Sequence, residues 1–104
     1  MHYIIIARDG TDEGAALRRM NAREEHLRNC KEGADKGYNL IAAAMLDNDD
    51  QMNGSVLIVE HPTRQALDEW LANDPYTLEG VWKDVEIIPC KIPPFFENIV
   101  KAAK

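Results

Sequence analysis

His26 is the residue of this chain whose type and neighbours best suit proton transfer. An unperturbed imidazole titrates at about pH 6.5, so it can accept or donate a proton close to neutrality. Arg19 and Arg23 precede it at short spacing, and nearby positive charges favour the neutral, basic form of the ring. The pattern indicates a general base, although a polar residue at the border of an amphipathic helix is the simpler interpretation.

Asp74 is the natural partner for this imidazole. A carboxylate beside a histidine fixes which ring nitrogen carries the proton and stabilises the charged ring. Asp74 directly precedes Pro75, and this dipeptide also suits the end of one helix and the N-cap of a following turn. Pairing and capping are both open from the sequence, and the choice depends on the elements that carry the two residues.

Those elements follow from the hydrophobic pattern. Apolar runs predict strands at residues 3–7, 40–46 and 56–59 and within 82–92. Helical spacing predicts helices over 13–35 and after Thr63, whose hydroxyl suits the N-cap position. The order β-α-β-β-α-β is typical of the ferredoxin-like α+β class, a four-stranded antiparallel sheet with two helices on one face. The helices lie side by side in that fold, so Asp74 can approach His26.

The long helix is predicted to bury one apolar stripe. Its members recur at about 100° per residue and are Ala16, Leu17, Met20, Leu27, Cys30 and Ala34. This placement would leave His26 at the edge of the stripe, between the core and solvent.

The expected strands are apolar on both faces, whereas helices cover only one. An uncovered apolar face of that size marks an interface, which predicts a homodimer whose two sheets pack face to face. Residues 1–92 would form the domain. The tail of residues 93–104, which begins Pro-Pro-Phe-Phe, would pack on the partner subunit.

Composition narrows the classes of function. A net charge of −6 over 104 residues predicts one domain and argues against binding to nucleic acid. The chain has no apolar run of membrane-spanning length and no signal peptide at its start, so a cytoplasmic location is expected. Four of the six arginines fall within residues 18–28, and this local basic edge suits a small anionic molecule.

The remaining reactive side chains predict no further chemistry. Cys30 and Cys90 are far apart in the sequence and are expected to be reduced thiols. The histidines lack metal-ligand spacing, so no metal is expected. His61 directly precedes Pro62 and is predicted to be a solvated turn residue.

Several short motifs together resemble the YciI-like (YCII-related) family. They are Arg19, the segment from Arg23 to Leu27, Gly54-Ser55, and Asp74-Pro75-Tyr76 followed by Gly80, and the resemblance runs from about residue 3 to 91. It implies a dimeric α/β barrel and an enzyme with His26 and Asp74 as its catalytic pair. It also implies that Ser55, Arg23 and Tyr76 line the same cleft.

Two positions depart from the pattern that this resemblance implies. Glu24 stands where such proteins often have proline, and Ala44-Met45 stands where they usually have a Gly-Pro step. The second departure affects a wall of the cleft.

The resulting hypothesis is a small enzyme without a cofactor that performs general acid–base chemistry on a small anionic or aromatic-derived metabolite. His26 would move the proton, Asp74 would orient it, Ser55 and Tyr76 would donate hydrogen bonds, and Arg19 or Arg23 would hold a carboxylate or enolate. Lyase, isomerase and hydrolase reactions all fit. The alternative is a non-catalytic binding or sensing module with the same cleft, and a haem or quinone monooxygenase of the same barrel class is a third option.

Overall fold

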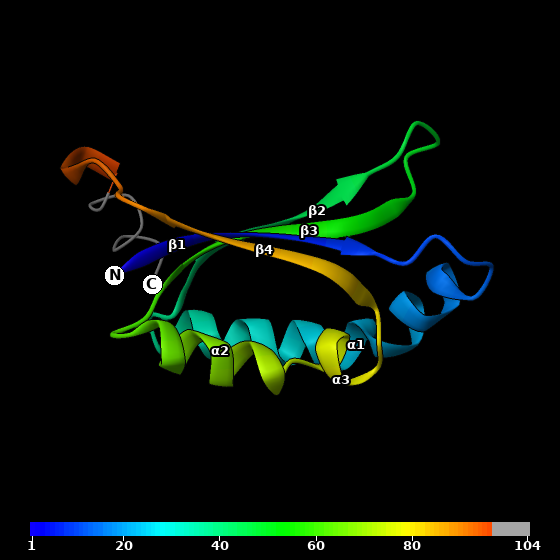
Figure 1. Cartoon of the computed structure of the whole chain (residues 1–104), viewed down its shortest axis with the longest axis horizontal. Coiled ribbons are helices and arrows are strands. Elements are labelled where there is room, and N and C mark those ends of the chain that lie inside the picture. The colour runs from blue at the N-terminus through cyan, green and yellow to red at the C-terminus, as the bar shows by residue number, and fades with distance from the viewer. Residues whose placement is uncertain (97–104) are drawn as a thin grey trace.

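A computed structural model describes residues 1–96 of the chain as one sheet covered on one side by helices (Figure 1). The elements within these residues are β1 (His2–Asp9), α1 (Ala15–Asp35), β2 (Asn39–Leu46), β3 (Met52–Glu60), α2 (Arg64–Ala72), α3 (Pro75–Leu78) and β4 (Trp82–Cys90). The strand order is β2-β3-β1-β4, with every neighbouring pair antiparallel. The predicted ferredoxin-like α+β class is confirmed, with α3 as an additional short helix. Most of the predicted tail, residues 97–104, lies outside the described residues.

The central strands alternate between two apolar faces. Tyr3, Ile5 and Ala7 of β1 point toward the helices and are buried, as are their β3 neighbours Leu57 and Val59. The register pairs Ile5 with Leu57 and Ala7 with Ser55, so a serine enters the inner face at one end of the core. This polar position becomes important in the site described below.

The outer face of the sheet is also apolar and has no helix over it (Figure 1). Ile4 pairs with Ile58, Ile6 pairs with Val56, and Ile41 of the edge strand β2 pairs with Ile58 on its other side. Alternation therefore places β-branched side chains on both faces, as the continuous apolar runs of the sequence predict.

Helix α1 presents a different face to the sheet from the one predicted. Leu17 and Met20 of the expected stripe are 65% and 60% exposed. The buried residues of α1 are instead either small or polar with hydrogen-bond partners, namely Ala15, Arg19, Ala22, His26 and Gly33. Small residues allow the helix to approach closely: a Cβ added at Gly33 would collide with the side chain of Asn39. The predicted stripe is wrong, because polar partners on other elements decide the face.

The segment from α2 to β4 folds as its local signals predict. Thr63 Oγ1 accepts a hydrogen bond from the Ala66 N–H at 3.1 Å, which confirms Thr63 as an N-cap. Asp74 caps α3, with Pro75 in its first turn. Gly80 adopts φ +69°, a conformation that favours glycine, and the chain then enters β4 at Trp82. None of the described helices is long and apolar enough to cross a membrane.

Candidate active site

His26 and Asp74 form a buried pair between the middle of α1 and the start of α3. His26 is 7% exposed, and its Nδ1 lies 2.8 Å from Asp74 Oδ1. Asp74 Oδ1 also accepts from the Tyr76 N–H at 2.8 Å, and its Oδ2 accepts from Asn29 Nδ2 at 3.1 Å. Because the carboxylate accepts in every contact, Nδ1 carries the proton of the neutral imidazole and Nε2 holds the basic lone pair. His26 is therefore buried rather than at the border, and Asp74 is both cap and partner.

Tyr76 holds the imidazole plane in place. The two rings stack with centroids 3.7 Å apart and planes 8° from parallel, and the Arg19 guanidinium carbon lies 4.7 Å from the tyrosine centroid. Trp82 meets the edges of both rings, at 5.6 Å from His26 and 5.5 Å from Tyr76. Burial raises the pKa of Tyr76, with Arg19 and Arg23 opposing that effect. The phenol is therefore protonated at neutral pH and can donate.

The guanidinium group of Arg19 is hydrogen-bonded to other side chains of the protein. Its Nη1 binds both oxygens of Asp9 at 2.9 and 3.1 Å, and its Nη2 donates to Ser55 Oγ at 3.1 Å. Ser55 Oγ also accepts from Trp82 Nε1 at 3.2 Å. Both members of the Arg19–Asp9 pair are almost fully buried. The structure thus places Arg19 beside the site as a paired group, whereas Arg23 is exposed and makes no ion pair within residues 1–96.

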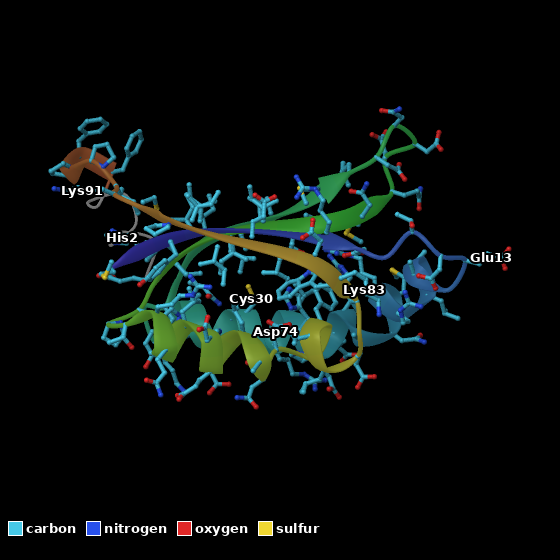
Figure 2. The ribbon with its side chains drawn as sticks, viewed as in Figure 1. His2, Glu13, Cys30, Asp74, Lys83 and Lys91 are labelled. Carbon is cyan, nitrogen blue, oxygen red and sulfur yellow. The ribbon has the colours of Figure 1, made fainter. Side chains whose placement is uncertain are left out.

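A pocket of about 230 Å³ opens between α1 and the β2–β3 side of the sheet. Its polar lining consists of the predicted residues Arg19, Arg23, His26, Ser55 and Tyr76, and its apolar lining includes Leu27, Ala42, Ala44, Met52 and Leu57. Asp74 lies behind His26 and does not line the pocket. Five predicted residues therefore meet at one cavity, with the sixth supporting one of them. Asp74 and Cys30 both lie below the sheet, in or next to the helical layer (Figure 2).

Cys30 also lines the pocket, from the same helix as His26. Burial raises the pKa of its thiol, and the charge of Asp74 acts in the same direction. A protonated thiol is a weak nucleophile. Cys30 is thus a wall of the pocket rather than a reactive group.

Sequence reasoning missed Asp9 and Trp82. Asp9 ends β1 and Trp82 begins β4, and the sheet pairs these two positions directly. Neither residue belongs to a motif with recognisable spacing. The available signal was indirect: a buried arginine requires an acidic partner, but the burial of Arg19 was not itself predicted.

A second buried histidine, His61, lies in a different environment. It is 2% exposed and stacks on Tyr38, with ring centroids 4.7 Å apart. Its Nε2 is buried without a hydrogen-bond partner in the described part of the chain. Burial lowers the pKa of His61, and the charged N-terminus adds to this effect. The prediction of a solvated turn residue is wrong, because Tyr38 and Trp70 enclose the ring.

Among residues 1–96, no group of three or more histidine, cysteine, aspartate or glutamate side chains is arranged to hold a metal ion. The polar side chains that line the pocket supply imidazole, phenol, hydroxyl and guanidinium groups. These groups transfer protons and stabilise negative charge.

Comparison with known proteins identifies relatives over almost the whole chain. The model of the YCII-related domain matches residues 1–91. An uncharacterised protein of Haemophilus influenzae is 32% identical over 97 residues, covering 88% of this chain and 97% of that protein. Protein YciI of Escherichia coli O6:H1 shows the same identity and coverage.

Solved structures share the fold at lower sequence identity. The dehydrochlorinase TftG of Burkholderia phenoliruptrix, which acts on 5-chloro-2-hydroxyhydroquinone, was solved in complex with 2,5-dihydroxybenzoquinone. It superposes with a TM-score of 0.77 at 22% identity, covering 91% of this chain and 98% of that one. An antibiotic biosynthesis monooxygenase superposes with a TM-score of 0.53 at 19% identity, covering 89% and 100%.

Proposed function

The chain belongs to the YCII-related domain family, and from this premise we propose that it is an acid–base enzyme acting on a small anionic, ring-shaped metabolite. The observation that carries the proposal is the 2.8 Å contact between His26 Nδ1 and Asp74 Oδ1 at the wall of a pocket. This contact leaves Nε2 of the imidazole as the basic atom. Such a pair is suited to lyase, isomerase or hydrolase reactions that begin with removal of a proton.

In the proposed mechanism, His26 Nε2 removes a proton from the bound substrate. Asp74 stabilises the imidazolium that forms, and the stacked Tyr76 ring keeps the imidazole in one orientation. A positioned general base contributes roughly 10²–10⁴-fold to a rate. The same nitrogen can return the proton to another atom of the substrate or to the leaving group, so the chain's own side chains can complete the transfer.

The lining of the pocket supports the substrate class. A cavity of about 150 Å³ accepts benzene, so about 230 Å³ accommodates a substituted six-membered ring between the apolar walls. Tyr76 and Ser55 supply hydrogen-bond donors at the polar end. Arg23 is the cation for an anionic group, because Arg19 is already paired with Asp9.

The reaction named for TftG is compatible with this chemistry. Dehydrochlorination removes hydrogen and chloride from a molecule, and a general base can take the proton while chloride leaves. A dihydroxybenzoquinone is also a small ring with acidic oxygens. A substituted hydroquinone or a similar enolisable ring is therefore a reasonable first substrate class for this chain.

The test is a turnover screen of halogenated and unhalogenated hydroxy-aromatic compounds with the native protein, His26→Gln and His61→Gln. For a compound that is turned over, we expect His26→Gln to lower kcat by at least about 10²-fold. His61→Gln replaces an equally buried histidine outside the pocket, and kcat should stay within a few-fold of native. Unchanged turnover in His26→Gln would remove His26 from the mechanism.

A binding or sensing module is the second candidate. The observation that favours it is the capping role of Asp74, which gives this carboxylate a structural reason to be present. In that case the pocket would hold a ligand without converting it. A tightly bound compound that remains chemically intact after prolonged incubation with the native protein would support this alternative.

The outer face of the sheet supports a homodimer as part of the same proposal. It is lined by apolar side chains that no helix within residues 1–96 covers, namely Ile4, Ile6, Ile41, Val56, Ile58 and Ile88. Two such faces packing together would remove this surface from water. Sedimentation equilibrium should then give twice the chain mass of 11.8 kDa, and a monomer at micromolar concentration would contradict this part of the proposal.

A further inference from the structure

The hydroxyl of Ser55 has both of its acceptor positions occupied. A serine hydroxyl offers one donor and two lone pairs. Arg19 Nη2 donates to Ser55 Oγ at 3.1 Å, and Trp82 Nε1 donates to the same oxygen at 3.2 Å. These two N–H groups use both lone pairs of the oxygen, so only the hydroxyl proton is left for a further hydrogen bond.

That proton has no acceptor among the described residues. Ser55 is buried and lines the pocket with His26 and Tyr76. Each side-chain hydrogen bond of Ser55 within residues 1–96 has Oγ as the acceptor. The hydroxyl can thus interact with a pocket ligand only by donating to it.

Most of the other polar groups that line the pocket are also hydrogen-bond donors. The Tyr76 hydroxyl makes no hydrogen bond within residues 1–96, and burial keeps the phenol protonated by raising its pKa. Arg23 carries only donors. Among the groups at this end, His26 Nε2 is the acceptor, because Nδ1 donates to Asp74. The pocket therefore offers several donors and a single base.

We propose that Trp82 and the Asp9–Arg19 pair are positioning residues that fix Ser55 as an obligate donor, so that the site selects substrates in their phenolate or enolate form. This inference rests on the proposed function, since it describes the oxygen of the same substrate. Asp9 anchors the guanidinium with two hydrogen bonds, and Trp82 fixes the hydroxyl from β4. Neither residue needs to touch the substrate.

The fixed donor role of Ser55 has a specific consequence for binding. A neutral phenol that points its O–H at Ser55 meets an oxygen without an available lone pair, whereas a phenolate oxygen receives a hydrogen bond. Donors that are oriented before binding need no reorganisation when negative charge arrives. Without the indole N–H, the serine could rotate and accept from the neutral phenol.

The test uses 4-nitrophenol, whose ionised form is coloured, as the probe. The dissociation constants of phenol and phenolate are obtained from absorbance titrations across a range of pH. We expect the native protein to bind the phenolate at least about tenfold more tightly than the phenol. Ser55→Ala should weaken phenolate binding about tenfold and leave phenol binding unchanged. Trp82→Phe should lower the preference a few-fold, by improving the affinity for the neutral phenol.

Trp70→Phe is the matched control, because Trp70 is an indole outside this network that meets the Tyr38 ring edge to face. It should keep the native preference. A general packing defect would weaken both forms of the probe together and would not change their ratio. An independent check without ligand is the Trp82 indole N–H resonance, which should move upfield in Ser55→Ala while that of Trp70 stays in place.

Three results would overturn the inference. The first is a native protein that binds neither form or binds both equally, and the second is a folded Trp82→Phe protein with the full preference. The third is a Trp82 resonance that is unaffected by Ser55→Ala. If the preference depends on Ser55 and Trp82 but no compound is turned over, the inference stands and the enzymatic proposal fails. If turnover requires His26 while Trp82→Phe changes nothing, the enzyme stands and the inference fails.

Discussion

His26 and His61 are both buried imidazoles, exposed by only 7% and 2%, yet their surroundings differ in kind. His26 belongs to a partnered end, which we define as His26, Asp74, Arg19, Asp9 and Ser55. In that end the titratable groups are joined by hydrogen bonds of 2.8–3.1 Å. His61 belongs to an aromatic end, defined as Tyr38, His61 and Trp70, where ring contacts hold the imidazole.

The difference shows what distinguishes a candidate site from a core histidine. Burial alone disfavours the charged imidazole, and this effect lowers the pKa of His61. His26 differs in having the Asp74 carboxylate 2.8 Å from its Nδ1, and this carboxylate can stabilise the charged ring that proton abstraction creates. Both histidines line cavities, so it is the partner and not the cavity that separates them.

The largest expected effect comes from removing the charge of Asp74. Asparagine is as good an N-cap as aspartate, so Asp74→Asn preserves the start of α3 while the imidazolium loses its counter-charge. We expect kcat toward an identified substrate to fall about 10³-fold, by analogy with triad aspartates. Thr63→Ala, which removes the cap of α2 instead, should cost about 1 kcal/mol of stability and leave kcat near native. Comparable kcat values for the two variants would contradict the pairing.

The second prediction concerns the buried ion pair of the partnered end. Asp9→Asn leaves the Arg19 charge buried without compensation, and the free energy of unfolding should fall by about 3 kcal/mol. The control is Glu86→Gln, which breaks the half-exposed pair between Arg8 and Glu86 at 2.8 Å. That change should cost less than about 1 kcal/mol. Urea denaturation of the two variants measures both values, and equal costs would show that the burial of Arg19 has no energetic consequence.

The third prediction is that His61, in the aromatic end, makes the stability of the fold depend on pH. Because the folded pKa of His61 lies below its ordinary value of 6.5, the unfolded chain binds a proton that the folded chain excludes. This contribution destabilises the fold as pH falls below about 6.5, and it levels off beneath the folded pKa. His61→Phe should therefore match native stability at neutral pH and exceed it at acidic pH. The measurement is the urea midpoint of both proteins across pH, and parallel curves would contradict the assignment.

The smallest effect is expected at Cys30. The charge of Asp74 helps to raise the pKa of this thiol, so Asp74→Asn should increase its alkylation by iodoacetamide a few-fold at mildly alkaline pH. Cys90 provides an internal reference in the same molecule, and its rate should not change. Identical Cys30 rates in native and variant proteins would place the Asp74 charge elsewhere or show it to be screened.

Local signals in the sequence predicted the elements of this fold, because each depends on a few neighbouring residues. The apolar strands, the Thr63 cap and the Asp74-Pro75 turn are of this kind. The pairing of His26 with Asp74 was within reach once the fold class was known, since the class places the two helices side by side.

What could not be predicted depends on partners from distant elements. Periodicity selected Leu17 and Met20 for the core because they are among the larger apolar residues of α1. The structure buries Arg19 and His26 instead, since Asp9, Ser55 and Asp74 supply their hydrogen bonds. The sequence neighbours of His61 likewise predicted a solvated turn. The rings that cover it belong to Tyr38, just before β2, and to Trp70 of α2.

The contact with Asp74 should hold the neutral His26 ring with its proton on Nδ1. Its most direct test is nitrogen-15 NMR of the ring nitrogens in the native protein and in Asp74→Ala. In the native protein, the neutral ring should show a protonated Nδ1 and a bare Nε2. The variant should lose that preference, while the His61 signals stay unchanged. A native His26 that carries its proton on Nε2, or a tautomer that does not respond to the loss of Asp74, would show that Asp74 does not set the tautomer of His26.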